Sequence, residues 1–199
     1  MSSLSLADLP TANLDTLRQT LLDLICQVAY KEGDFKLSSG QKSDYYINGK
    51  QVTLHAEGGL MVARLLLNML PDETAGVGGL TLGADPMVSA VSIVGAYEGR
   101  PVTPLIIRKE AKGHGTRAYI EGPTLPEGSA IAILEDVVTT GASALKAVER
   151  LRDAGYKVNN IFALVDRQQG GAELYEKEGL NFKPIFTIEA VKANWRSQQ

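Results

Sequence analysis

The chain of 199 residues has 44% hydrophobic and 22% charged side chains and a formal net charge of −3, which is ordinary for one globular domain and argues against a broad nucleic-acid-binding face. Cys26 is the only cysteine, so an internal disulfide is excluded, a cysteine-based zinc site is not expected, and the composition suits a reducing cytosol. No apolar run reaches membrane-spanning length and the N-terminus lacks a signal-peptide pattern, so we expect a cytoplasmic protein without a nucleic-acid or membrane partner.

The N-terminal residues predict an extension followed by a helix. Residues 1–14 show no clear period, so we expect a flexible extension ahead of a single domain over 15–199. In residues 15–31 the apolar side chains recur at helical spacing and form one stripe. Gly33 follows and can end this helix.

Residues 34–47 predict a β-hairpin, because two alternating segments flank the sequence Ser-Gly-Gln-Lys. The hairpin carries two adjacent tyrosines, Tyr45 and Tyr46. The pattern alone leaves open whether these rings stack on a flat ligand or pack in the sheet.

The middle of the chain alternates helices and strands. We expect helices over 53–70 and 85–97 and strands over 74–78 and 102–107. An Asp-Pro pair opens the second helix, with the aspartate as the expected N-cap. The glycine-rich turn at 78–84 either lets the backbone approach a pyrophosphate or simply makes a tight turn.

Residues 108–117 differ from the rest of the chain, because they gather cationic side chains around two glycines and have no apolar face. A charge run of this kind is usually a solvated loop. This one directly follows a buried-type strand, where an α/β sheet places its binding site. A mobile cationic loop at that position suits closure over a polyphosphate.

The most informative stretch begins with an apolar run at 131–134, followed by Glu135 and Asp136, a turn rich in hydroxyl groups at 139–143 and a helix over 144–154. A continuous apolar run is typical of a buried parallel strand. The two carboxylates would therefore sit at the carboxyl end of that strand, where open α/β sheets bind ligands.

The turn at 139–143 has the composition of a phosphate site, with three hydroxyl side chains, a glycine and a helix N-terminus behind it. Adjacent carboxylates repel a phosphate, so Glu135 and Asp136 need another task, such as accepting ribose hydroxyls or holding a hydrated Mg²⁺. Together these features indicate a phosphorylated sugar. The alternative is an ordinary strand-to-helix connection whose Thr and Ser side chains cap the helix.

The C-terminal part predicts a strand over 158–165 that ends in Asp166 and Arg167. An arginine at this edge either grips a ligand carboxylate or pairs with the neighbouring aspartate. We expect further elements at 171–178 (helix), 184–187 (strand) and 188–195 (helix). The repeated strands and helices predict an α/β domain with a mainly parallel sheet flanked by helices.

Three motifs resemble those of known families. The apolar strand with two acids and Val-Val-Thr-Thr-Gly-Ala-Ser at 137–143 resembles the phosphoribosyl-diphosphate (PRPP) motif of the type I phosphoribosyltransferases. The loop Arg-Lys-Glu-Ala-Lys-Gly-His-Gly resembles the flexible catalytic loop of orotate phosphoribosyltransferases. The hairpin Leu-Ser-Ser-Gly-Gln-Lys-Ser-Asp-Tyr-Tyr-Ile resembles the N-terminal hood of the same family. The motifs occur in matching order from about Leu17 onward.

The resemblance implies a type I phosphoribosyltransferase fold with a small hood, built from about 15–50 and C-terminal segments. It also implies a glycosyltransferase that joins PRPP and orotate with Mg²⁺, giving orotidine 5′-monophosphate and pyrophosphate in pyrimidine biosynthesis. In the family the loop reaches into the neighbouring subunit, so a homodimer sharing 108–117 is implied.

The resemblance also implies roles for individual residues. Those matching catalytic positions are Lys112, His114 and Asp136. Those matching PRPP-binding positions are Arg108, Lys109, Lys112, His114, Glu135, Asp136, Val137, Val138, Thr139, Thr140, Gly141, Ala142 and Ser143. Those matching orotate contacts are Thr139, Arg167 and Tyr46. No direct metal ligand is assigned, and Mg²⁺ is expected to arrive with PRPP near Glu135 and Asp136.

The chain departs from the family at Ser38, where many members carry lysine, and at Leu82, where some members do. Fewer fixed cations would leave more of the pyrophosphate contact to the mobile loop. Two rival functions keep the PRPP motif: transfer to another base, and PRPP sensing without catalysis. The hood motif and Arg167 argue against the first, and the short, weakly basic N-terminus argues against an added nucleic-acid-binding module.

Overall fold

The computed structural model describes residues 7–36, 42–112 and 118–199. Within these residues lies a six-stranded sheet with the order β5-β4-β3-β6-β7-β8. Its strands are β3 (Thr74–Leu80), β4 (Thr103–Ile107), β5 (Ile120–Glu121), β6 (Ala130–Val138), β7 (Lys157–Asp166) and β8 (Asn181–Thr187). β4 and β5 pair antiparallel, whereas the other neighbours pair parallel, which confirms the mainly parallel sheet.

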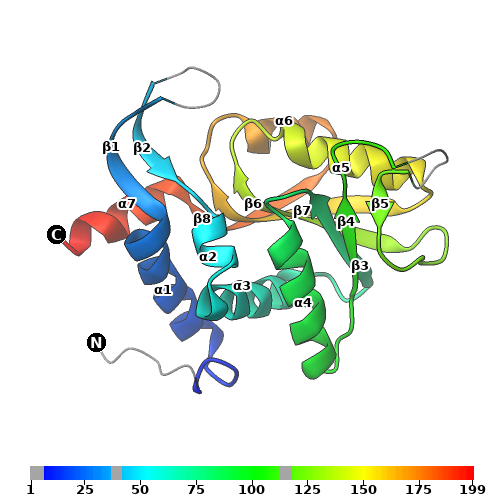
Figure 1. The fold of residues 1–199 in the computed structure, drawn as a ribbon, viewed down its shortest axis with the longest axis horizontal. Coiled ribbons are helices and arrows are strands. Elements are labelled where there is room, and N and C mark those ends of the chain that lie inside the picture. Colours follow the sequence, from blue (N-terminus) through cyan, green and yellow to red (C-terminus); the bar gives the residue numbers. More distant parts are fainter. Residues whose placement is uncertain (1–6, 37–41, 113–117) are drawn as a thin grey trace.

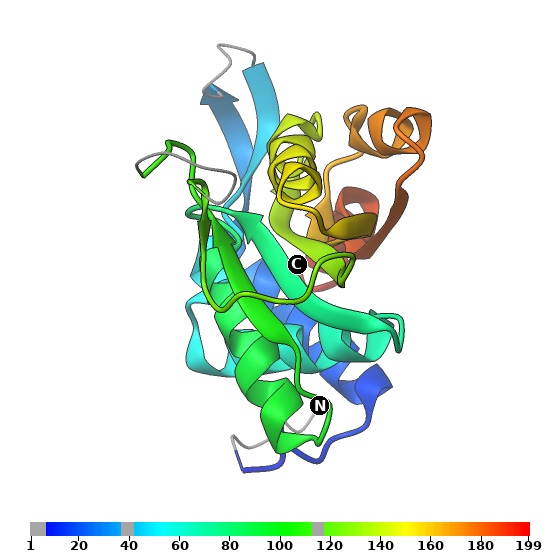
Figure 2. The same cartoon turned by 90° about the vertical axis from the view of Figure 1, so that its right-hand side faces the viewer.

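Helices cover both faces of this sheet (Figures 1 and 2). On one face lie α1 (Leu14–Leu24), the π-helix η1 (Ile25–Ala29), α2 (Lys50–Thr53), α3 (Ala56–Met69), α4 (Asp85–Tyr97) and α7 (Ile188–Ser197), and on the other α5 (Ala142–Asp153) and α6 (Gly171–Lys177). The apolar run of β6 divides between the two layers. Ala132 and Leu134 belong to the first core, and Ile131 and Ile133 belong to the second, because successive strand side chains point to opposite faces.

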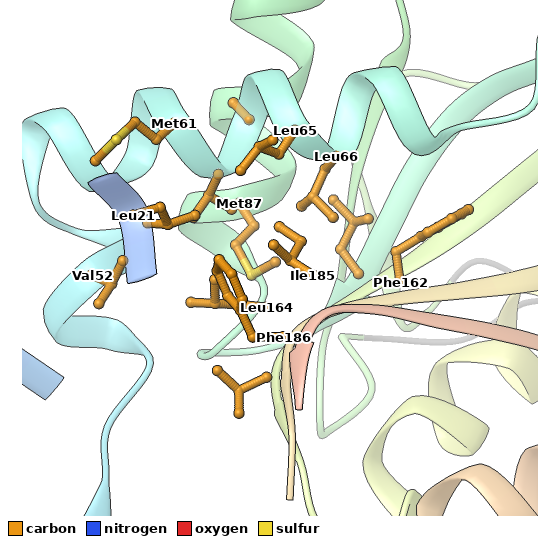
Figure 3. Packing of buried hydrophobic residues seen from close by; sticks show 14 of the residues in the cluster. Leu21, Val52, Met61, Leu65, Leu66, Met87, Phe162, Leu164, Ile185 and Phe186 are labelled. Carbon is orange, nitrogen blue, oxygen red and sulfur yellow. The ribbon is translucent and has the colours of Figure 1, made fainter. Parts of the chain in front are cut away.

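Figure 3 shows the larger core between the sheet and the first helical layer. Met61 and Leu66 of α3 belong to this cluster together with Leu164 of β7 and Ile185 of β8, and all four side chains are buried. This packing fixes the strands whose carboxyl ends form the site. None of the helices in the described ranges is long and apolar enough to cross a membrane.

The N-terminal helix is shorter than predicted. α1 ends at Leu24, η1 continues to Ala29, and strand β1 (Tyr30–Lys36) begins where a helix was expected to run on to residue 31. Gly33 lies within β1 with φ +150°, where the hairpin register shifts, and does not end a helix. The tertiary contacts of Tyr30, which is 1% exposed, outweigh the local helical pattern.

The predicted hairpin is confirmed, because β1 pairs antiparallel with β2 (Lys42–Ile47) and projects beside the sheet. The predicted helix over 53–70 corresponds to α3, which begins at Ala56 and ends at Met69, whereas Thr53 ends the separate short helix α2. The residue before Pro71 is extended, as the proline ring requires. Asp85 is the first residue of α4 and not its N-cap, a position that Ala84 occupies.

Part of the predicted flexible extension packs against the domain. Leu9 is 1% exposed and belongs to the larger core. Arg64 of α3 donates hydrogen bonds to the carbonyls of Leu9 (2.9 Å) and Ala12 (2.8 Å). Residues 9–12 are therefore not a loosely held extension, and the part of the prediction that concerns residues 1–6 lies outside the described residues.

Candidate active site

The candidate site lies where β3 and β6 separate at the carboxyl edge of the sheet. β6 pairs with β3 only as far as Gly78 and Ile133, but it pairs with β7 as far as Val138 and Asp166. Successive connections lead outward in opposite directions from this point, which is the position where open α/β sheets bind ligands. We predicted that both acids sit at the end of the strand. They lie instead within β6, past Ile133, the last residue of β6 that pairs with β3.

Asp136 is enclosed by the backbone of two turns and is 8% exposed. A Cβ atom on Gly83 would lie 2.4 Å from Asp136 Oδ1, and one on Gly49 would lie 2.9 Å from Asp136 Cβ. The Nζ of Lys50 lies 3.9 Å from Asp136 Oδ2. Burial raises the pKa of Asp136, and Lys50 opposes that shift. The sequence pattern did not reveal Lys50, because residues 50 and 136 meet only in the fold.

Glu135 is equally buried, at 8% exposed, and lines a pocket beside the turn. Within the described chain, its buried Oε2 has no hydrogen-bond partner. Burial, and then the charge of Asp136, raise the pKa of Glu135 to about 8, while Lys109 and Lys50 act in the opposite direction. A buried carboxyl without a partner is costly, so this atom is suited to a ligand that brings hydroxyl groups.

The turn at 139–143 forms an open pocket at the start of α5. Its lining residues are Glu135, Val137, Val138, Thr139, Thr140, Gly141, Ala142, Ser143 and Tyr175. α5 begins at Ala142, two residues earlier than predicted, and Gly141 stands at the N-cap with φ +85°. No described side chain caps this helix. The capping alternative is therefore not supported, and the helix presents its first N–H groups to the pocket.

The second wall of the pocket comes from α6, which the sequence did not assign to the site. A Cβ on Gly141 would lie 2.8 Å from the Tyr175 ring, and one on Gly171 would lie 2.4 Å from Val138 Cγ1. Tyr175 is fully buried, and burial raises the pKa of its hydroxyl, which keeps it protonated. A tyrosine in a short polar helix gave no signal of this role.

Arg167 stands at the carboxyl end of β7, where its N–H donates to the carbonyl of Val138 (2.9 Å). Its side chain is buried, and its Nε donates to the hydroxyl of Tyr45 at 3.0 Å. The predicted alternative, a pair with Asp166, is not formed; Asp166 Oδ1 instead accepts from the N–H of Gln168 at 2.8 Å. The buried Nη2 of Arg167 has no hydrogen-bond partner among the described residues.

The two adjacent tyrosines of β2 occupy different environments. Tyr45 is 4% exposed and its hydroxyl contacts Arg167. Its ring is therefore packed inside the protein, as the second alternative for these tyrosines predicted. Tyr46 is 43% exposed and lies 5.6 Å, between ring centroids, from Phe35. The structure does not bring Tyr46 to Arg167, and its predicted contact with the base stays a prediction.

The cationic loop leaves the sheet as a short ribbon. The N–H groups of Arg108 and Lys112 donate to the carbonyls of Tyr119 and Ala118, each at 2.8 Å. Glu121 on β5 lies 3.2 Å from Arg108 and 3.7 Å from Lys112, measured between charged atoms. Both cations therefore pair with an acid inside the loop region.

Helix α5 links this loop to the turn at 139–143. Arg150 of α5 donates to the carbonyls of Arg108 and Lys109, and its guanidinium lies 4.1 Å from the centroid of the Tyr119 ring. Lys109 also lines a cavity with Ser143, so the loop base adjoins the turn. His114 and Ser38 lie outside the described residues, while Leu82 is 67% exposed.

Similar proteins are consistent with this site. No family model matches the chain. It is 68% identical to the orotate phosphoribosyltransferase of Nostoc sp. over 178 residues, covering 89% of this chain and 86% of that protein. It is 62% identical to the enzyme of the same name from Synechocystis sp. over 198 residues, covering 100% of both chains.

Solved structures agree with these relatives. The Mycobacterium tuberculosis orotate phosphoribosyltransferase in complex with Fe(III) dicitrate superposes with a TM-score of 0.79 at 36% identity, covering 88% of this chain and 98% of that one. Its complex with PRPP gives a TM-score of 0.75 at 33% identity, with 88% and 99% coverage. The chain therefore belongs to the orotate phosphoribosyltransferase family and has its type I phosphoribosyltransferase fold.

Proposed function

We propose that this chain transfers the 5-phosphoribosyl group from PRPP to orotate, releasing pyrophosphate and forming orotidine 5′-monophosphate for pyrimidine biosynthesis. The observation that carries the proposal is the shared edge of three features: two buried acids, an uncapped helix start and a buried arginine. Membership of the orotate phosphoribosyltransferase family supports the same reaction.

The sugar phosphate is proposed to lie across the end of β6. The N–H groups at the start of α5 and the hydroxyls of Thr139, Thr140 and Ser143 suit the 5′-phosphate. Glu135 and Asp136 suit the ribose hydroxyls, which donate to carboxylate oxygens. The positions of Val137, Val138, Gly141 and Ala142 in the same lining support their predicted contacts.

The two acids also fit a Mg²⁺ ion that arrives with the diphosphate. Magnesium prefers oxygen ligands and commonly binds one or two carboxylates together with substrate phosphates. The unpartnered Oε2 of Glu135 and the nearby carboxylate of Asp136 supply such oxygens. When bound, the ion neutralises charge on the phosphate oxygens.

The cationic loop is proposed to serve the leaving group. As the bond from the anomeric carbon to pyrophosphate breaks, the sugar becomes oxocarbenium-like and negative charge builds on pyrophosphate. Arg108, Lys109, Lys112 and His114 would stabilise that charge, each preorganised donor contributing roughly 2.7–4 kcal/mol. Loop closure would also keep water from the reactive sugar, while Asp136 holds the ribose.

Orotate is proposed to bind between the hood and Arg167. The guanidinium can hold the base carboxylate through two parallel hydrogen bonds. Thr139, on the lining of the phosphate pocket, and Tyr46, on the exposed side of the hairpin, are the further predicted contacts. A nitrogen of the pyrimidine then forms the bond to the anomeric carbon as pyrophosphate leaves.

We propose further that the enzyme works as a homodimer in which 108–117 reaches the partner's site. The exposure of the Lys112 side chain, 72% in the single chain, supports a target outside its own subunit. We also propose a cytoplasmic location, because the single buried thiol of Cys26 suits a reducing compartment.

The test mixes the protein with Mg²⁺, PRPP and orotate and follows pyrophosphate release together with consumption of orotate. We expect release that depends on all three additions. Release with adenine, hypoxanthine or uracil in preference to orotate would point to a different transferase. PRPP binding without release for any base would support a sensor and contradict the proposed reaction.

A further inference from the structure

We infer that Tyr45 is a positioning residue for Arg167, holding the guanidinium so that its remaining donors meet the carboxylate of the base. This inference rests on the proposed contact between Arg167 and orotate. It assigns a role to Tyr45, whereas the family resemblance assigned a base contact only to its neighbour Tyr46.

Arg167 needs an anchor for its side chain. Its backbone is fixed, because its N–H donates to the Val138 carbonyl at 2.9 Å and the next residue, Gln168, turns the chain with φ +55°. Its side chain is long and flexible, yet it is only 9% exposed. Among the described residues the buried Nη2 of Arg167 has no hydrogen-bond partner. A buried guanidinium donor requires an acceptor, and a planar carboxylate matches its geometry.

Tyr45 supplies two contacts that together set the orientation of this group. The Nε of Arg167 donates to the Tyr45 hydroxyl at 3.0 Å, in a buried hydrogen bond. The guanidinium carbon lies 4.9 Å from the centroid of the Tyr45 ring. With Nε committed to the hydroxyl and the group held against the ring, the direction of the terminal nitrogens is fixed.

Tyr45 is itself held by an aromatic cluster between the hairpin and α7. Its ring is stacked with that of Tyr30 at 5.9 Å, and Trp195 of α7 meets Tyr30 edge-on at 5.6 Å. Packing in this cluster accounts for the ring of Tyr45 but not for its hydroxyl. The hydroxyl makes its buried hydrogen bond to Arg167, which favours a positioning role over packing alone.

A second cation shares the same ring. The Nζ of Lys192 on α7 lies 4.6 Å from the Tyr45 centroid and 3.8 Å from Asp44 Oδ2. Two cations beside one ring make this end of the site attractive to an anion. The unpartnered Nη2 of Arg167 therefore suits a ligand that carries a carboxylate, and a carboxylate-free base gains nothing from the arrangement.

The first measurement compares Tyr45→Phe with wild type in the complete enzyme. Loss of a hydrogen bond to a charged group should raise the KM for orotate, and the Kd for orotidine 5′-monophosphate, by about tenfold. The KM for PRPP should stay unchanged. Tyr30→Phe is the matched control, because it removes a hydroxyl from the stacked ring that bonds to Glu32 and not to Arg167. It should leave the KM for orotate unchanged.

A double-mutant cycle then separates the two claims. Product binding is measured by calorimetry for wild type, Tyr45→Phe, Arg167→Met and the double variant. We expect Tyr45→Phe to have no further effect once Arg167 is absent. If Arg167→Met is unfolded in a thermal melt, Arg167→Lys replaces it, since lysine keeps the charge but has no Nε–H.

The outcomes are distinguishable. Product binding unaffected by loss of Arg167 would overturn the assignment of Arg167 to the base, and this inference with it. Weak binding by the Arg167 variant but normal binding by Tyr45→Phe would overturn the positioning role alone. An equal effect of Tyr45→Phe in both backgrounds would also overturn it. Formation of orotidine 5′-monophosphate by wild type tests the overall reaction independently.

Discussion

The end of β6 and the loop after β4 are built in opposite ways. Glu135 and Asp136 are each 8% exposed. The backbone of two glycines approaches Asp136 closely, and Glu135 lines a pocket together with the buried Tyr175. The side chains of Arg108 and Lys112 are 39% and 72% exposed and pair with Glu121. The first region is acidic and shaped by folding, whereas the second is cationic and held by ion pairs that solvent can reach.

This contrast suggests a division of labour between ground state and transition state. A buried, preformed region can bind the sugar phosphate without rearrangement. An exposed region whose cations already have an anionic partner can exchange that partner for pyrophosphate at low cost, because exposed ion pairs are weak. The contrast predicts that changes in the loop affect turnover, while changes near β6 affect binding and stability.

Replacing Lys112 by alanine should give the largest effect. It removes one donor to the developing charge on pyrophosphate, so turnover should fall roughly 100- to 1000-fold. PRPP affinity should change little, because the end of β6 is intact. Steady-state kinetics and calorimetry measure the two quantities, with Lys157→Ala, an exposed lysine at the opposite edge of the sheet, as control. Turnover near that of wild type would remove Lys112 from the chemistry.

Replacing Gly141 by alanine tests the preformed turn. Gly141 has φ +85°, and an added Cβ would lie 2.8 Å from the Tyr175 ring. The left-handed backbone conformation of a residue with a side chain costs roughly 1–2 kcal/mol of stability. Relief of the clash should also move the turn, so the affinity for PRPP should fall about tenfold or more. Calorimetry with PRPP measures the change.

The control for this variant is Gly179→Ala, which has φ +67° but open space around the new Cβ. It should lose stability from strain while binding PRPP normally. Unchanged PRPP affinity in Gly141→Ala would show that the turn does not hold the phosphate.

The sequence predicted features made by consecutive residues. The apolar run, the two acids and the turn at 139–143 are local, so their order and chemistry were visible without the fold. The parallel sheet followed from buried strands alternating with helices. Element ends were less certain, as the early start of β1 at Tyr30 shows, because long-range packing decides them.

Partners from distant elements could not be predicted in the same way. Lys50 meets Asp136, and Tyr45 meets Arg167, across large separations in the chain. Nothing in their local sequence distinguishes them from surface or packing residues. The pattern gave the chemistry of the site, and only the fold gave the residues that position it.

Replacing Glu135 by glutamine tests the cost of the buried acid. Burial raises the pKa of Glu135 from the usual 4.5 to about 8 in the folded protein. Between these two pH values Glu135 is therefore protonated in the folded protein and ionised in the unfolded chain. The free energy of unfolding of wild type should therefore fall as pH rises from about 4.5 to 8. At about 1.36 kcal/mol per pKa unit, even half of the shift gives on the order of 2 kcal/mol.

The variant should lack this loss, so it should be more stable than wild type at pH 8 and similar near pH 5. Urea unfolding of the ligand-free protein across this range measures the difference. Glu178→Gln, at an exposed acid following α6, is the control and should follow wild type. Parallel curves for wild type and Glu135→Gln would contradict burial of this carboxyl.

Replacing Glu121 by glutamine should give the smallest effect and tests the other half of the contrast. It removes the acid that pairs with Arg108 and Lys112, and such exposed pairs are worth about 0.2–1 kcal/mol. If Glu121 competes with the leaving pyrophosphate for these cations, its loss should raise turnover by up to about fivefold, with little change in PRPP affinity. Glu98→Gln, which breaks the pair with Arg64 on α3, is the matched control. A lowered turnover in Glu121→Gln would mean instead that Glu121 holds the loop cations in their working positions, and the loop would then be preformed like the end of β6.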